Sequence, residues 1–214
     1  MDKNTCHIVA ASDIYNERPN LEKGDLLIAA DGGLSHLEKL KMAPDIVVGD
    51  FDSYHETPHA KDVRRLDPIK DDTDTLKCVK IGLEKGFRRF IIYGGMGGSF
   101  RHTLANLQTL CYLCEHDAVG YLLGESEIIT AIKDRTALFK EDAKGFISLF
   151  SMGNMAIVTE ENLKYTLDEY EVTNYFPIGV SNEFLGKQAR IAVTGMAAIV
   201  FDKSNGLDAI SFIK

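Results

Sequence analysis

The stretch RFIIYGGMGGSFRHTLANL, residues 89–107, indicates the fold class. It begins as a short apolar run of strand type, and four glycines follow within the five positions 94–98, called here the glycine loop. Beyond the loop, Leu104 and Leu107 lie at the spacing of one helix face, which Cys111 and Cys114 continue. A strand that passes through a glycine loop into a helix is the repeating unit of an α/β protein.

The first 130 or so residues repeat this alternation of apolar runs and helical segments. Helices are expected at 33–42 and 74–86, where Gly86 is a natural stop. Near-continuous apolar strands that alternate with helices form a parallel sheet covered on both faces. We therefore expect residues 1–134 to form an α/β domain with a Rossmann-like parallel sheet. The strand runs are 6–12, 26–31, 45–50, 89–95 and 118–124.

From about Arg135 the sequence consists of short β-prone runs with turn residues between them and lacks long amphipathic helices. This pattern predicts a small all-β domain over residues 135–214, either a sandwich or a barrel. We expect the sandwich. The boundary is expected near Lys133–Thr136. The run ARIAVTGMAAIVF (189–201) is apolar enough for an interface, which makes a homodimer plausible.

Composition excludes several classes of protein. The chain has 214 residues and a net charge of −8, which argues against unassisted binding to nucleic acid or anionic lipid. No run approaches the roughly 18 apolar residues of a membrane span. The N-terminus MDKNTCHIVAAS has no signal-peptide pattern, and the four cysteines form no disulfide framework. We expect a cytoplasmic protein.

Two aspartates follow the third strand run in GDFDS (49–53). Side chains alternate along an extended chain, so Asp50 and Asp52 point in the same direction and repel each other. A divalent cation would remove this repulsion, and carboxylates suit Mg²⁺. A turn capped by aspartates is the structural alternative.

Three more acids open a predicted helix in KDDTDTL (70–76): Asp71, Asp72 and Asp74. Acids are favourable at a helix N-terminus, and Asp72 or Thr73 can be the N-cap. That reading explains one or two of the acids but not all three. With the pair of GDFDS, they would form a cluster of four or five carboxylates, which resembles a metal-dependent phosphoryl-transfer site.

Two glycine-containing turns complete the candidate site. Asp31 ends a strand, and Gly32-Gly33 turn into a helix whose N-terminus would favour an anion, although a purely structural turn is an alternative. The glycine loop could wrap phosphates with its backbone N–H groups, or be a tight turn beside a solvated His102. His102 and Asn106 share one helix face. Neither a Walker motif nor GxGxxG is present. The acids could bind a metal ion and the glycine turns could bind phosphate, so metal-assisted transfer of a phosphoryl-type group is the expected chemistry.

In the order and spacing of six segments, the chain resembles the thiamine pyrophosphokinase family from about Asp31 to Glu183. These segments are ADGG, PDIVVGDFDS, KDDTD, GGMGGSFRHTLANL, NLKYTL and GVSNEF. The resemblance implies an α/β nucleotide domain followed by a β-sandwich, in a homodimer with active sites at the subunit junction. It also implies transfer of a pyrophosphoryl group from ATP to the thiamine hydroxyl, with Mg²⁺ as cofactor and AMP as the second product.

The resemblance also implies roles for individual residues. Mg²⁺ would be held by Asp50, Asp52 and Asp74, with Asp71 close by, and either Asp71 or Asp74 would take the hydroxyl proton. The ATP-binding residues would be Asp31, Gly32, Gly33, Gly95, Gly97, Gly98, Ser99, Arg101, His102 and Asn106. Ser181, Asn182 and Glu183 would lie near the thiamine pyrimidine, although this segment alone reads as a plain β-turn.

One departure from the family keeps other functions open. The family loop usually continues as GGRxDH, whereas Ser99 and Arg101 stand here where Arg and Asp are usual. Arg101 has the reach to contact a phosphate from its shifted position. The alternatives are a pyrophosphokinase for another alcohol, such as a hydroxymethylpterin, and a nucleotide- or thiamine-binding protein without turnover. In each case the expected partners are small molecules, not nucleic acid or membrane.

Overall fold

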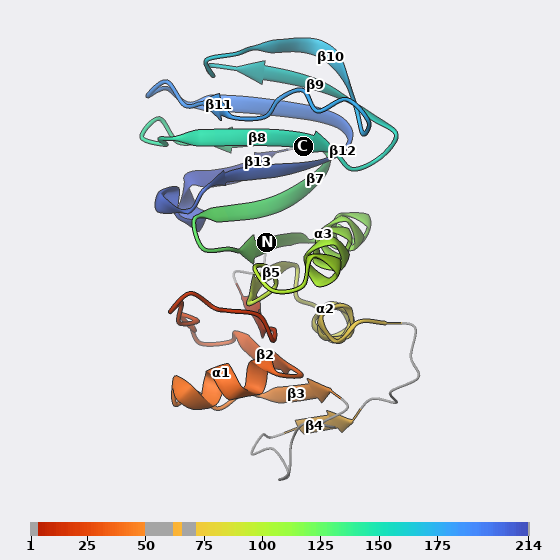
Figure 1. Ribbon diagram of the computed structural model, residues 1–214, viewed down its shortest axis with the longest axis vertical. Coiled ribbons are helices and arrows are strands. Elements are labelled where there is room, and N and C mark those ends of the chain that lie inside the picture. The colour runs from red at the N-terminus through yellow and green to blue at the C-terminus, as the bar shows by residue number, and fades with distance from the viewer. Residues whose placement is uncertain (1–3, 50–61, 66–71, 214) are drawn as a thin grey trace. The chain divides into compact units, whose positions relative to one another are not determined.

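The computed structural model describes residues 4–49, 62–65 and 72–213. It has a mixed α/β fold in two compact units, Met1–Glu125 and Ser126–Lys214, called here the α/β unit and the β unit (Figure 1). The expected boundary at Lys133–Thr136 lies inside strand β7 (Glu127–Phe139), which pairs along its whole length with β12 (Ala189–Asp202). The two compact units divide before this strand.

The described part of the α/β unit has six strands, and every pairing between them is parallel. The strands that the sequence predicted are apolar and buried. The sequence did not predict β4, because its residues DVRR lack the apolar run of a covered strand. The strands are β1 (Thr5–Val9), β2 (Leu26–Ala30), β3 (Ile46–Gly49), β4 (Asp62–Arg65), β5 (Arg89–Tyr93) and β6 (Val119–Leu123).

Strand order places the loops that matter at one edge of this sheet. The order is β6-β5-β1-β2-β3-β4, so the chain builds outward from β1 in one direction and then returns to the other side of it. The direction reverses between β1 and β5. In open α/β sheets, ligands bind at the carboxyl ends of the strands beside such a reversal.

Three helices cover this sheet: α1 (Gly33–Lys39), α2 (Asp74–Glu84) and α3 (Phe100–Glu115). A methyl group on Gly82 of α2 would lie 2.5 Å from the Phe90 ring, and one on Gly120 of β6 would lie 2.4 Å from Leu113 of α3. Phe90 and Gly120 are partners in the ladder, so α2 and α3 cover the same face. Figure 1 shows α1 on the opposite side. None of the helices in the described ranges is both long and apolar enough to cross a membrane.

The described strands of the β unit pair with one another in antiparallel fashion. Strand β12 is central, since it pairs with β7 along one edge and with β9 and then β8 along the other. The run expected to form an interface is this strand, and most of its apolar side chains are buried in the core, so they contribute mainly to the packing of this unit. The remaining strands are β8 (Phe146–Ser151), β9 (Met155–Glu161), β10 (Leu167–Thr173), β11 (Asn182–Glu183) and β13 (Ile210–Ile213).

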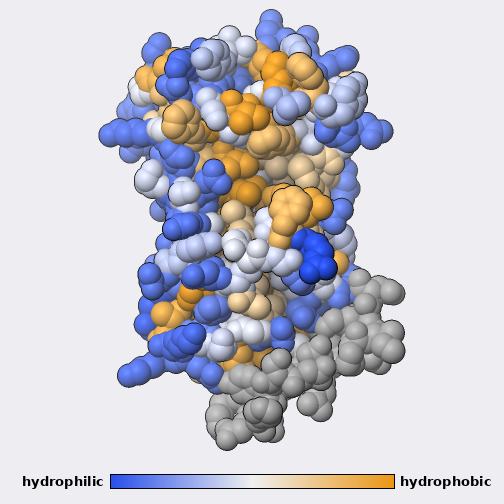
Figure 2. All heavy atoms as spheres, in the orientation of Figure 1, coloured by the Kyte–Doolittle hydropathy of each residue, from blue (hydrophilic) through white to orange (hydrophobic). Residues whose placement is uncertain are grey.

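Aromatic packing anchors the β unit. The Phe139 ring lies 5.1 Å from the Phe184 ring and 5.2 Å from the Phe201 ring, which joins β7, β12 and the residue after β11. Other apolar side chains of this unit reach its surface (Figure 2). Phe146, Met155 and Tyr170 are each at least 40% exposed.

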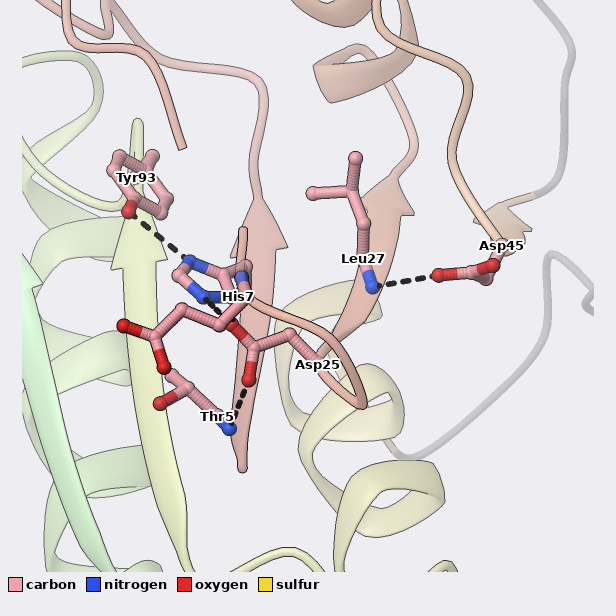
Figure 3. A network of polar contacts seen from close by, with 7 residues as sticks. Thr5, His7, Asp25, Leu27, Asp45 and Tyr93 are labelled. Atoms are coloured by element: carbon pink, nitrogen blue, oxygen red, sulfur yellow. Dashed lines mark hydrogen bonds and ion pairs between the residues drawn. The ribbon is translucent and has the colours of Figure 1, made fainter. Parts of the chain in front are cut away.

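A buried polar network ties the start of the α/β sheet together (Figure 3). The two ring nitrogens of His7 lie 3.1 Å from the Tyr93 hydroxyl and 3.2 Å from Asp25 Oδ2. Asp25 also accepts a hydrogen bond from the Thr5 N–H. Burial lowers the pKa of His7 in spite of Asp25, so the ring is neutral at pH 7. A neutral ring donates to the carboxylate and accepts from the tyrosine, which satisfies all three groups.

Replacing His7 by Leu should remove both ring contacts and leave the Tyr93 hydroxyl unpaired within the core. We expect the free energy of unfolding to fall by about 1–3 kcal/mol, measured by urea denaturation. Tyr93→Phe removes only one hydroxyl and should cost less, about 0.5–1.5 kcal/mol. Equal stability of His7→Leu and wild type would show that the network contributes nothing.

Candidate functional site

The loops that leave β1 and β5 are joined beyond the strand ends. The Ala10 N–H donates to the Tyr93 carbonyl at 2.8 Å, and the Ser12 N–H donates to the Gly94 carbonyl at 3.0 Å. Gly94 has φ +62°, and a methyl group there would lie 2.6 Å from the carbonyl oxygens of both Ala10 and Ser12. Only glycine fits this position, so the first residue of the glycine loop is fixed by its neighbour strand.

The glycine loop is anchored at one end and exposed at the other. Asn106 is buried, and its side-chain Nδ2 donates to the Gly95 carbonyl at 2.8 Å. This bond ties α3 to the loop, so the Asn106 amide orients the loop. Gly97 and Gly98 are exposed, with the Tyr15 hydroxyl and Ser12 hydroxyl directly against them.

Ser12 and Tyr15 therefore belong to this candidate site, although the sequence did not indicate them. They follow strand β1 in the segment ASDIY (11–15), which carries no recognisable motif. Three site residues that the sequence did predict lie at the start of α3. Ser99 occupies the N-cap position without a side-chain capping bond, and Arg101 and His102 are exposed on the first turn beside the loop.

The Asp31 turn lies at the same edge. Asp31 has φ +45°, and its N–H donates to the Val48 carbonyl at 2.7 Å. A methyl group on Gly33 would overlap the Val9 carbonyl, so this glycine is required by close packing of α1 on β1. The Asp31 carboxylate faces β3, since a methyl group on Gly49 would lie 3.4 Å from its Oδ1. Gly32 is the N-cap residue of α1.

The two described acids of KDDTD, Asp72 and Asp74, have different surroundings. Thr73 is the N-cap of α2, and its hydroxyl accepts from the Leu76 N–H at 3.2 Å. Asp72 forms a salt bridge with Lys80, whose Nζ lies 2.6 and 2.7 Å from the two carboxylate oxygens. Asp72 is therefore occupied by a partner in its own helix region. Asp74 lies in the first turn of α2, where it is partly exposed.

Three predicted residues, Asp50, Asp52 and Asp71, lie outside the described residues. Within residues 4–49, 62–65 and 72–213, no three side chains of metal-binding type come together. Of the acids predicted near the metal, Asp74 alone belongs to the described part of the chain.

In the β unit, Asn182 is a buried hub. Its Oδ1 accepts from the backbone N–H groups of Tyr165 and Glu183, both at 2.9 Å. Its Nδ2 donates to the Tyr165 carbonyl at 2.6 Å and to Glu160 Oε2 at 2.9 Å. Both amide hydrogens and both lone pairs are used, so the side chain fixes the local backbone.

The neighbours of Asn182 are exposed or partly exposed. Ser181 has φ +56°, and its N–H donates to the Ser148 hydroxyl at 2.9 Å. Glu183 forms a salt bridge with Lys164. Glu160 is 3% exposed, and burial raises its pKa to about 7 although the Asn182 hydrogen bond opposes this. Removing a carboxyl from water disfavours its charged form.

A parallel sheet whose strand order reverses beside a glycine loop defines an α/β protein that binds a small ligand at the carboxyl edge of its sheet. Residues 18–121 match the model of the thiamin pyrophosphokinase catalytic domain, and residues 136–196 match that of the thiamin pyrophosphokinase vitamin B1 binding domain. The chain belongs to the thiamin pyrophosphokinase family, which is a family of enzymes.

Known relatives agree with this family. Thiamin pyrophosphokinase 1 of Caenorhabditis elegans is 27% identical over 192 residues, which cover 82% of this chain and 78% of that protein. The thiamine pyrophosphokinase structure from Bacillus subtilis has a TM-score of 0.81 at 23% identity, covering 92% of this chain and 98% of that one. For yeast thiamin pyrophosphokinase the TM-score is 0.74 at 18% identity, with 94% and 87% covered. These two structures share the fold.

The raised pKa of Glu160 predicts a specific pH dependence of stability. The folded protein holds the Glu160 proton up to about pH 7, whereas the unfolded chain loses it near pH 4.5. Because the folded state binds more protons in this window, stability should fall as pH rises from 4.5 to 7.

Glu160→Gln should abolish that contribution, which we expect to be about 2–4 kcal/mol across the window. Urea denaturation of wild type and variant at several pH values gives the difference curve. Parallel curves would mean that Glu160 titrates normally in the folded protein.

Proposed function

We propose that this chain transfers a pyrophosphoryl group from ATP to the hydroxyl of thiamine, yielding thiamine pyrophosphate and AMP. The observation that carries the proposal is the match of both family domains in chain order, together with a glycine loop at the strand reversal of the α/β unit. ATP is the pyrophosphoryl donor that family membership implies.

We further propose that the two parts of the chain bind different substrates. The α/β unit would be a Rossmann-like ATP-binding catalytic domain. The β unit would be a β-sandwich that binds thiamine and supports a homodimer in the cytoplasm. The vitamin B1 binding model, over residues 136–196, falls within the β unit, which supports its assignment to thiamine.

Mg²⁺ is proposed as the cofactor, held by Asp50, Asp52 and Asp74. The described donors fit this ion in kind, because Asp74 and Asp31 offer carboxylate oxygens, and Asp31 faces the end of β3 that precedes Asp50. When bound, Mg²⁺ would neutralise phosphate charge at the site.

The chain's own residues would do the remaining work. Backbone N–H groups of the exposed half of the glycine loop would bind phosphate oxygens, and Arg101 would add a cation at the first turn of α3. Asp71 or Asp74 would accept the proton of the attacking hydroxyl. Ser181, Asn182 and Glu183 would form or support the thiamine contact. Holding the two substrates in line would supply much of the rate enhancement.

The test of the proposed function is an acceptor assay. Purified protein with ATP and Mg²⁺ should form AMP when thiamine is added and not when a hydroxymethylpterin is added. AMP formation with the pterin alone would identify a pyrophosphokinase for that alcohol. Binding of ATP and thiamine without AMP over hours would identify a non-catalytic binding protein.

Asp74 and Asp72 provide a matched pair for this assay. Asp74→Asn should lower kcat by about two orders of magnitude or more, as expected for the loss of a charged group at the reacting phosphates. Asp72→Asn should leave kcat within about threefold, because Asp72 is occupied by Lys80 and such a partly exposed pair contributes little. Equal effects of the two changes would remove Asp74 from the proposed site.

The glycine loop makes a second prediction. Gly94→Ala should push the loop away from Ala10 and Ser12 and raise the KM for ATP about tenfold or more. Gly86→Ala is the control, because Gly86 also has positive φ, at +93°, but a methyl group there would meet no atom within 4 Å, and the residue lies just after α2. Both changes strain the backbone by about 1–2 kcal/mol, and Gly94→Ala adds the clash with the two carbonyl groups, so its melting temperature should fall further. A rise in the KM for ATP that is confined to Gly94→Ala, measured well below both melting temperatures, would support the loop as the ATP site.

A further inference from the structure

The carboxyl group of Glu160 is placed where an ionisable side chain is costly. Glu160 lies in β9, and its partners in register on the adjacent strands are Leu167 of β10 and Ile191 of β12. Its side chain is buried, and its Oε2 accepts a hydrogen bond from the side-chain amide of Asn182, the first residue of β11. Burying a carboxyl group among apolar neighbours costs stability, so its single amide contact calls for an explanation.

The contact fixes which way the Asn182 amide points. A carboxyl oxygen of Glu160 accepts the Nδ2 hydrogen whether the group is ionised or carries its proton on the other oxygen. The Tyr165 and Glu183 N–H groups hold the acceptor end of the amide, and the Tyr165 carbonyl accepts the second Nδ2 hydrogen. A flipped amide would set oxygen against oxygen at the Tyr165 carbonyl and, when Glu160 is ionised, at Glu160 as well.

The fixed amide in turn holds two exposed residues together. Asn182 bonds both the N–H and the carbonyl of Tyr165, whose side chain is 61% exposed. Ser181, the exposed residue directly before Asn182, is held at positive φ by its own bond to Ser148. The Asn182 amide has no hydrogen-bonding capacity left for a ligand, whereas Ser181 and Tyr165 present their side chains to solvent.

We propose that Glu160 is a positioning residue for thiamine: through the Asn182 amide it holds the backbone of Tyr165 and Glu183, and so sets the surface around Ser181 that contacts the substrate. The inference rests on the proposed function. Within the segment 181–183 this changes the predicted role of Asn182, which would hold the backbone in place, while its exposed neighbours would contact thiamine.

The test compares three variants in the AMP assay and in calorimetric titration with thiamine. Glu160→Met keeps the side-chain volume but removes the acceptor, and should raise the KM for thiamine about tenfold while the KM for ATP stays within about twofold. Glu160→Gln keeps an acceptor oxygen and should restore the wild-type KM for thiamine. Glu161→Met is the matched control on the same strand, because Glu161 is exposed and pairs only at the surface with Arg190.

A second pair of variants covers the case in which Glu160→Met is not recovered folded. Asn182→Asp sets two carboxyl groups against each other and should raise the KM for thiamine. Adding Glu160→Gln to it should lower that KM again, because the glutamine amide can donate to the new carboxylate. Failure of the double variant to improve on Asn182→Asp would overturn the proposal.

The remaining outcomes separate this inference from the proposed function. If wild type forms AMP from thiamine but Glu160→Met and Glu160→Gln have unchanged KM values, the positioning role is wrong and the function stands. If the KM values for ATP and thiamine rise together with a lower melting temperature, Glu160 serves stability alone and the positioning role is again wrong. If wild type binds thiamine without forming AMP, the calorimetric dissociation constants test Glu160 while the proposed reaction fails.

Discussion

The α/β unit depends on one constraint, the pairing of β1 with β2 on one side and β5 on the other. Strand β5 comes more than 75 residues after β1, so this pairing closes a long loop and brings distant segments to one edge. The ladder continues past the strands through the hydrogen bonds of Ala10 and Ser12, and it leaves Gly94 no room for a side chain. The position of the glycine loop is therefore a consequence of sheet pairing, before any ligand is considered.

Several polar side chains near the site also bind the protein itself. Asn106 and Asn182 were both expected to contact substrate, yet each spends hydrogen bonds on the protein's own backbone, at Gly95 and at Tyr165. Asp72 is likewise engaged by Lys80. A site made from loops must satisfy its backbone groups internally, since an unpaired buried group costs about 1–3 kcal/mol. Residues that hold the loops are therefore as characteristic of the site as residues that contact the substrate.

Sequence reasoning predicted the features that depend on local pattern. The covered strands, the three helices and the loop after β5 follow from apolar runs, helical spacing and glycines. It missed β4, because a strand of DVRR has no apolar signal. Ser12 and Tyr15 could not be found, since their place beside Gly97 and Gly98 depends on long-range pairing and not on spacing.

The β unit shows why residue type alone does not assign a role. The run at 189–201 is as apolar as an interface would be, but its position between β7 and the β8–β9 side makes it core. Glu160 is the opposite case, because its type predicts exposure and the structure buries it. A buried carboxyl group costs stability where a well-packed apolar side chain would be at least as stable, so its presence at this position favours a role in specificity. The hydrogen bond to the Asn182 amide fits that role, because an apolar side chain in place of Glu160 would leave one Nδ2 hydrogen unpaired.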